Sequence, residues 1–128
     1  LAHWGYCADQ QEYLALLERC HLVLSTAWHD FQGLAILQAA SSGATALVPN
    51  GLAYPEWFAA EFRYGSEKAF AHKDLNNLAT DAAGLISDYA LGIRPLNNVD
   101  TDCWGWGALK ERYCQLFDSL KTKGQSPS

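Results

Sequence analysis

The order of apolar and polar residues between positions 21 and 49 restricts this chain to a small set of folds. Residues 21–25 are almost continuously apolar, as in a buried strand. A polar loop follows, then an apolar run of helical length over 33–42, and a second short apolar segment over 45–49. Strand, helix and strand in this order imply a right-handed crossover between parallel strands. We therefore predict an α/β fold, with a Rossmann-like parallel sheet flanked by helices.

Capping residues and apolar periodicity predict the remaining elements. Asp9 and Glu12 have the spacing of a capping box, and Asp74 is a second candidate cap. We expect a strand over 3–6, a helix from Asp9 to about residue 20, a short helix from Tyr54 that ends before residue 63, a helix from Asp74 to about residue 89, and an amphipathic helix over 106–120. At least three parallel strands are therefore expected between residues 3 and 49.

Composition indicates one globular domain and excludes several classes of function. The chain has 128 residues, of which 49% are hydrophobic and 18% charged, enough for a single core. We expect this domain over 1–123 and a flexible tail over 124–128. The net charge of −5 and the scattered cations give no nucleic-acid-binding surface. No apolar run approaches the roughly 20 residues that span a bilayer, so no membrane contact is expected.

Cysteine and histidine spacing argues against metal and redox chemistry. The four cysteines form no Cys-x-x-Cys pair, which favours a reduced, cytoplasmic protein. The two His–Cys pairs, near residues 3–7 and 20–21, do not have zinc-ligand spacing. Ser25, His29 and Asp30 have the residue types of a catalytic triad, but neighbouring His and Asp cannot adopt its geometry. We therefore expect no metal and no cofactor.

The loop after residue 25 and the start of the next helix form the first candidate ligand site. Ligands of open parallel sheets bind at the carboxyl ends of the strands, where helix N-termini present N–H groups to anions. The amides of Gly33, Leu34 and Ala35 are candidates for a phosphate contact, because glycine lets the backbone approach a ligand closely. From this layout alone, an ordinary strand–turn–helix is the simpler interpretation, and Asp30 fits a helix cap equally well.

Several short segments together resemble a known family. They are His3-Trp4-Gly5-Tyr6, Ser25-Thr26-Ala27, residues 29–35, Val48-Pro49-Asn50 and Leu52-Ala53-Tyr54-Pro55-Glu56. Asp30 and Gln38, with seven residues between them, occupy the two positions of a Glu-x7-Glu signature. The chain thus resembles the family 4 retaining glycosyltransferases of the GT-B fold, in particular the tRNA-queuosine α-mannosyltransferase-like branch. The likeness covers about the first 65 residues, with a looser echo over 106–113.

The resemblance assigns roles to individual residues. It implies that Asp30 is catalytic and faces the transferred sugar. It implies that Gln38 accepts hydrogen bonds from the ribose, more weakly than a carboxylate would. The donor-binding residues that it implies are Gly5, Tyr6, His29, Phe31, Gln32, Gly33, Leu34, Gln38, Tyr54, Pro55 and Glu56. Pro55 and Glu56 by themselves are equally well explained as an ordinary helix start.

For the whole molecule, the resemblance implies a two-domain enzyme of which this chain is the incomplete C-terminal, donor-binding half. The expected reaction is transfer of mannose from GDP-mannose to queuosine in tRNA, with the tRNA bound by a missing N-terminal domain. The isolated piece would be inactive, and its exposed sheet edge would favour self-association. Because Asp30 and Gln38 both depart from the family's acids, a non-catalytic nucleotide-binding or scaffold module is the alternative. A doubly wound protein unrelated to the family is a third interpretation.

Overall fold

A three-stranded parallel sheet lies at the centre of the protein. The computed structural model describes residues 3–29 and 32–123. Strands β1 (Leu22–Leu24), β2 (Thr45–Pro49) and β3 (Arg63–Tyr64) lie in the order β1-β2-β3, and both pairs are parallel. Val23 lies opposite Ala46, and Val48 lies opposite Arg63. The predicted α/β fold with a parallel sheet is confirmed.

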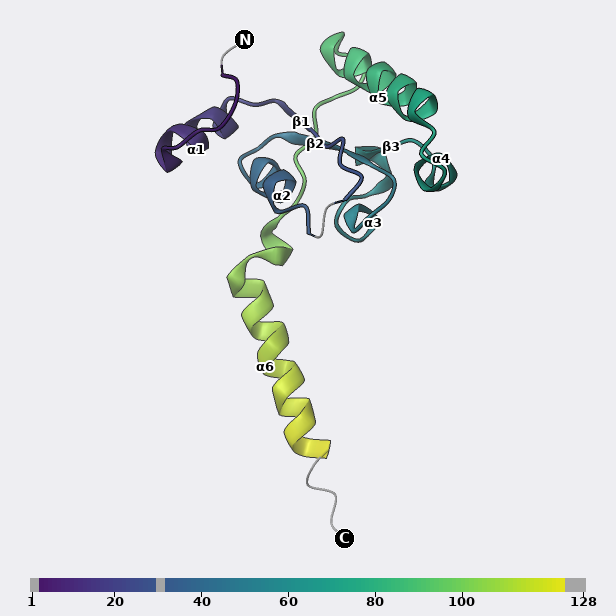
Figure 1. Cartoon of the computed structure of the whole chain (residues 1–128). Helices are drawn as coiled ribbons and strands as arrows, with labels where there is room; N and C mark the ends of the chain where they lie inside the picture. Colours follow the sequence, from purple (N-terminus) through teal and green to yellow (C-terminus); the bar gives the residue numbers. More distant parts are fainter. Residues whose placement is uncertain (1–2, 30–31, 124–128) are drawn as a thin grey trace.

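Helices cover both faces of this sheet (Figure 1). On one face lie α2 (Leu34–Ser41) and α3 (Tyr54–Trp57), and on the other lie α4 (Glu67–Ala71) and α5 (Leu75–Ala90). The remaining elements are α1 (Gln10–Glu18), the short 3₁₀ helices η1 (Ala60–Phe62) and η2 (Asp102–Trp104), and α6 (Trp106–Lys123). Two covered faces explain why every residue of β2 is buried, since the strands of such a sheet contact helices on both sides.

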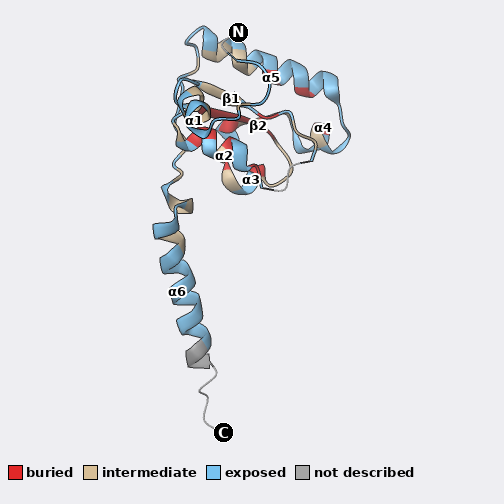
Figure 2. Cartoon of the chain, turned by 60° about the vertical axis from the view of Figure 1, so that its left-hand side comes forward, coloured by how far each residue is buried: buried red, intermediate tan, exposed pale blue. Residues whose placement is uncertain are grey.

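The core consists of two clusters, one on each face of β2. Ala46 and Val48 pack with Ile36 of α2 and with Tyr54 and Phe58, while Leu47 points to the other face. There, residues of α4, α5 and β3 surround the Leu47 side chain, which is fully buried. Burial of a side chain of this size contributes roughly 1.5–3 kcal/mol. The buried residues concentrate along β2 and the helix faces turned toward it (Figure 2).

The predicted helix boundaries have the expected capping interactions. The side chain of Asp9 accepts a hydrogen bond from the Glu12 N–H at 2.8 Å. Asp74 accepts one from the Asn77 N–H at 3.1 Å, at the start of α5. Each carboxylate satisfies an N–H group that has no partner within its own helix. Gly43 follows α2 with φ +100°, the left-handed conformation common after a helix.

The prediction of a strand over 3–6 was wrong. These residues are exposed and irregular, and Tyr6 is 89% exposed. The third parallel strand is β3 instead, which lies beyond residue 49. Its position is secured by hydrogen bonds from the Arg63 guanidinium to Asn50 Oδ1 at 2.7 Å and from the Asn50 N–H to the Tyr64 carbonyl at 3.0 Å. A strand of only two residues is too short to produce a recognisable alternation in the sequence.

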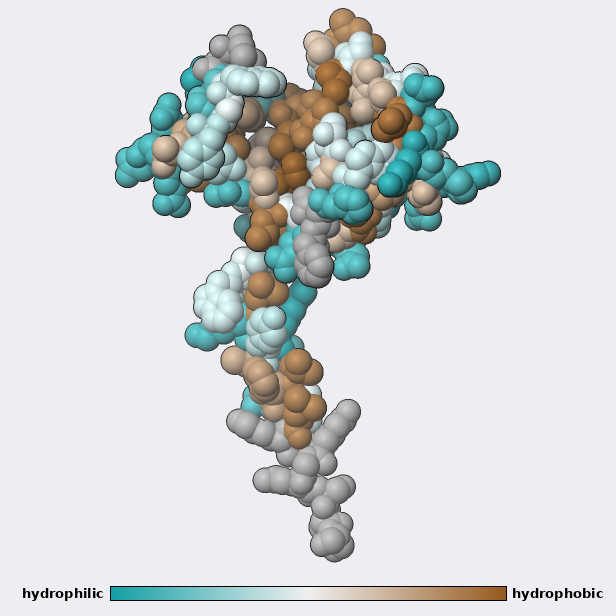
Figure 3. Space-filling view, in the orientation of Figure 1, coloured by the Kyte–Doolittle hydropathy of each residue, from teal (hydrophilic) through white to brown (hydrophobic). Residues whose placement is uncertain are grey.

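Helix α6 extends as predicted, but none of its described side chains belongs to either core cluster. The helix projects away from the rest of the protein (Figures 1 and 2). Apolar residues recur every three or four positions along this helix, at 106, 109, 113, 116 and 120. They are largely exposed to solvent: Leu116 is 53% exposed, and the adjacent Phe117 is 59% exposed. Figure 3 shows further apolar surface between α1 and α5. These faces support the expected self-association, which remains a proposal.

Within the ranges 3–29 and 32–123, no helix combines the length and the apolar character that crossing a bilayer requires.

Candidate functional site

Hydrogen bonds around Ser25 join the carboxyl ends of β1 and β3 and the start of α3. Ser25 follows β1 directly and is buried, and its Oγ lies 2.8 Å from the hydroxyl of Tyr54. The Tyr64 hydroxyl donates to the Ser25 carbonyl at 2.8 Å, and the Ala27 N–H donates to Ser25 Oγ at 3.3 Å. Buried tyrosines need partners for their hydroxyl groups. This network therefore fixes the position at which the loop over 26–29 leaves the sheet.

Gly33 begins α2 in a conformation and in a space that only glycine fits. Its φ is +62°, and a Cβ atom there would lie 2.7 Å from Tyr54 Cε1. The first bond of the helix runs from the Leu37 N–H to the Gly33 carbonyl at 2.9 Å. By helix geometry, the N–H groups over 34–36 have no acceptor within α2. Tyr54 therefore lies against the turn that precedes these amides.

Several of the predicted site residues surround the start of α2. His29 and Gln32 are exposed, and Leu34 is 65% exposed. Pro55 and Glu56 are exposed on α3, directly after the buried Tyr54. Asp30 and Phe31 lie outside the described residues. Gly33 lies next to the Tyr54 ring. This proximity brings the loop before α2 and the start of α2 close to the start of α3.

The other predicted site residues lie elsewhere. Gly5 and Tyr6 line a hollow of about 490 Å³ together with Tyr13 of α1. Because residues 3–6 form no strand, the expectation that Gly5 and Tyr6 end a strand at the sheet edge was wrong. Gln38 lines a different groove, of about 480 Å³, between α2 and η2. The described site residues are therefore distributed over three separate regions of the structure.

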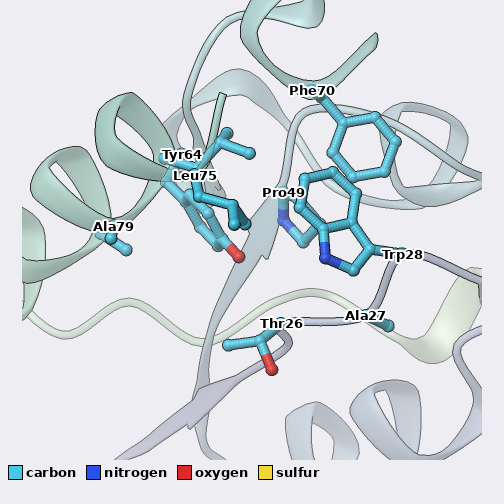
Figure 4. Close-up of a pocket in the computed structure, with 10 residues that line it drawn as sticks. Thr26, Ala27, Trp28, Pro49, Tyr64, Phe70, Leu75 and Ala79 are labelled. Atoms are coloured by element: carbon cyan, nitrogen blue, oxygen red, sulfur yellow. The ribbon is translucent and has the colours of Figure 1, made fainter. Parts of the chain in front are cut away.

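An apolar cavity that the sequence did not indicate lies at the carboxyl ends of the strands, on the α5 side. It measures about 200 Å³. Trp28 and Phe70 stack on one side of it, with ring centroids 5.1 Å apart, and Tyr64 and Leu75 lie opposite (Figure 4). Phe70 and Leu75 come from helices far along the chain, so no local sequence pattern predicts their meeting with Trp28. The apolar lining makes this cavity unsuited to a phosphate group.

The described residues carry few groups with altered acid–base chemistry. Burial, followed by the nearby Glu12 carboxylate, raises the pKa of the Cys7 thiol above its usual 9.0. This thiol therefore stays protonated near neutral pH, and it donates to the Asp9 carbonyl at 3.4 Å. The structure's described part contains no group of three or more His, Cys, Asp and Glu residues that could hold a metal ion.

The Tyr64 phenol makes protein stability depend on pH in the alkaline range. Burial raises the pKa of Tyr64 above its usual 10.0. The folded protein therefore keeps this proton at pH values where the unfolded chain has lost it. Tyr64 contributes its full stabilisation below about pH 10, and the contribution is lost as pH rises through the folded-state pKa. We expect urea unfolding between pH 8 and 11 to show a falling free energy of unfolding, and a shallower fall for Tyr64→Phe.

Taken together, the fold and the start of α2 define an α/β domain with a candidate anion-binding helix N-terminus at the carboxyl edge of a parallel sheet. Over 76 residues, the chain is 38% identical to the tRNA-queuosine alpha-mannosyltransferase of Drosophila melanogaster. The aligned part is 59% of this chain and 20% of that protein. The predicted resemblance to that branch is thereby confirmed, and the chain spans about a fifth of the relative's length. No family model and no solved structure matches the chain.

Proposed function

We propose that this chain is the donor-binding part of a retaining GT-B glycosyltransferase, which transfers mannose from GDP-mannose to queuosine in tRNA. The observation that carries the proposal is the 38% identity to a protein named for mannosyl transfer to tRNA queuosine. The position of the candidate site at the carboxyl edge of a parallel sheet supports it, because open α/β sheets bind nucleotides there.

In this proposal, the donor diphosphate binds at the start of α2. The amides over 34–36 supply hydrogen bonds and the positive end of the helix dipole, which stabilise the departing diphosphate without a metal ion. We assign to Asp30 the stabilisation of the positive charge that develops as the glycosidic bond breaks. His29, Pro55 and Glu56 lie near the sugar and the diphosphate. The base is assigned to the hollow that Gly5 and Tyr6 line.

The tRNA acceptor is assigned to another part of the enzyme. Binding of nucleic acid depends on Lys and Arg contacts with phosphates. This chain has a net charge of −5, with nine basic and fourteen acidic residues. We therefore place the basic tRNA-binding surface in a domain that precedes this chain in the enzyme.

The alternative is a nucleotide-binding module without catalysis. It is favoured by Asp30 and Gln38, which stand at two positions where the family has glutamate. Asp30 holds its carboxylate one methylene further back, and Gln38 carries no charge. A module of this kind binds the donor nucleotide but does not transfer the sugar.

Thermal-shift measurements on the full-length protein with GDP, GDP-mannose, UDP and ADP test the proposal. A ligand at 100 times its Kd stabilises the folded state by about 2.7 kcal/mol. We expect a clear rise in Tm with GDP and GDP-mannose and smaller rises with UDP and ADP. Binding without mannosyl transfer to queuosine-containing tRNA would favour the module. No rise in Tm with any of the four ligands would contradict both functions.

A further inference from the structure

We propose that Asp102 and Gln38 together bind the vicinal diol of the donor's ribose. This inference rests on the proposed function and names a residue that the sequence pattern did not single out. Asp102 is 64 positions after Gln38, on η2 rather than on α2. The structure nevertheless places both residues along one groove of about 480 Å³.

Apolar atoms, including those of Leu37 and Trp104, make up most of the groove's lining, and polar side chains stand on both of its sides. Gln38 and Ser41 contribute from the exposed face of α2, and Thr101, Asp102 and Trp104 contribute from the segment opposite. The Ser41 hydroxyl already donates to the Gln38 carbonyl at 3.0 Å. The Asp102 carboxylate is therefore the strongest hydrogen-bond acceptor available to a ligand in this groove.

The segment that carries Asp102 is held against the core. The Trp104 ring packs edge-on against Trp57, with centroids 5.1 Å apart, and against Phe58 at 6.3 Å. Upstream, the Thr45 hydroxyl donates to the Asn97 carbonyl at 3.0 Å, which ties the preceding loop to β2. These contacts restrict the motion of η2, so the backbone that carries Asp102 is held in place before any ligand binds.

The chemistry of the groove selects a neutral hydroxyl-rich group. A vicinal diol presents two O–H donors, and the Gln38 amide oxygen and the Asp102 carboxylate oxygens are acceptors for them. The negative charge of Asp102 repels a phosphate, so the diphosphate must lie elsewhere. Gln38 is five residues after Gly33, or about 7.5 Å along the helix axis. One helix can thus bind the diphosphate at its start and the ribose on its side.

This arrangement also gives a physical reason for the glutamine at position 38. A second carboxylate facing Asp102 would place two like charges in one groove, which disfavours ionisation of both. With Asp102 supplying the charged acceptor, the neutral amide of Gln38 avoids that repulsion. Asp102 of η2 thus supplies the negative charge that the family pattern has at position 38 and that Gln38 lacks.

Calorimetric titration with GDP and with 2′,3′-dideoxy-GDP tests the inference. We expect Asp102→Asn to raise the Kd for GDP roughly fivefold, because a hydrogen bond to a charged acceptor is about 1 kcal/mol stronger than one to a neutral acceptor. Binding of dideoxy-GDP should be the same in wild type and variant, because that nucleotide has no diol. Glu111→Gln is the matched control, since it removes the same charge from an exposed position of α6 outside the groove.

The double variant Asp102→Asn/Gln38→Glu moves the carboxylate across the groove and should restore GDP affinity to within about twofold of wild type. If Asp102→Asn binds GDP as wild type does, or weakens GDP and dideoxy-GDP equally, the inference is wrong while the proposed function stands. If wild type binds no GDP at all, the proposed function itself fails.

Discussion

Replacing Gly33 by alanine is expected to destabilise the protein by about 2–5 kcal/mol. Two costs add at this position. A non-glycine residue in the left-handed conformation loses about 1–2 kcal/mol, and Gly33 has φ +62°. The new methyl group would also lie 2.7 Å from Tyr54 Cε1. The buried Tyr54 ring, whose hydroxyl is hydrogen-bonded to Ser25, would therefore have to move. Urea unfolding of the variant measures the sum.

Gly92→Ala is the control that separates these two costs. Gly92 has φ +70°, nearly the same as Gly33, but a Cβ atom there meets nothing within 4 Å. The difference between the two variants therefore reports the contact with Tyr54 alone. Equal free energies of unfolding for both variants would mean that the Tyr54 ring does not confine Gly33. A Gly33→Val variant is a poor probe of phosphate binding, because its structural cost would hide any direct effect on the ligand.

Asp30→Asn is expected to lower the kcat of mannosyl transfer by about 100-fold, the cost typical of losing one group that stabilises transition-state charge. The affinity for GDP-mannose should change by less than about threefold, because a group that stabilises only the transition state contributes little to binding of the substrate. Asparagine keeps the size and one acceptor oxygen but removes the charge. Steady-state kinetics and donor titration of the same full-length preparation separate the two quantities.

Glu56→Gln serves as the control for Asp30→Asn, since it removes a charge from the first turn of α3 near the same site. We expect a smaller fall in kcat for Glu56→Gln than for Asp30→Asn. An Asp30→Asn enzyme with wild-type kcat would exclude Asp30 from a catalytic role. A parallel loss of donor affinity and kcat would assign it to ground-state binding.

Local sequence signals were sufficient for the elements whose residues interact with close neighbours along the chain. The capping carboxylates of Asp9 and Asp74 and the continuous apolar run of β2 predicted the correct elements. The sequence of strand, helix and strand also predicted the parallel pairing of β1 with β2. The two-residue β3 was missed, because hydrogen bonds from distant segments, including the one between Asn50 and Tyr64, define it rather than its own composition.

The candidate site was only partly predictable for the same reason. The position of Gly33 before an apolar helix is enough to predict its role, but no local pattern indicates that the Tyr54 ring fills the space beside it. The hydrogen bond between the Ser25 and Tyr54 hydroxyls joins residues that are 29 positions apart in the sequence. Asp102 and Gln38 are separated even further. Contacts across such distances depend on how the helices pack on the sheet, which local patterns do not encode.

Binding of the donor diphosphate at the start of α2 can be observed by mapping amide shifts in the ¹⁵N-labelled protein during titration with GDP. We expect the largest shifts on the amides of residues 34–36, at the start of α2, with further shifts at Gln38 and Asp102. Largest shifts around the apolar cavity at Trp28 and Phe70 instead, or no shifts at saturating GDP, would contradict it.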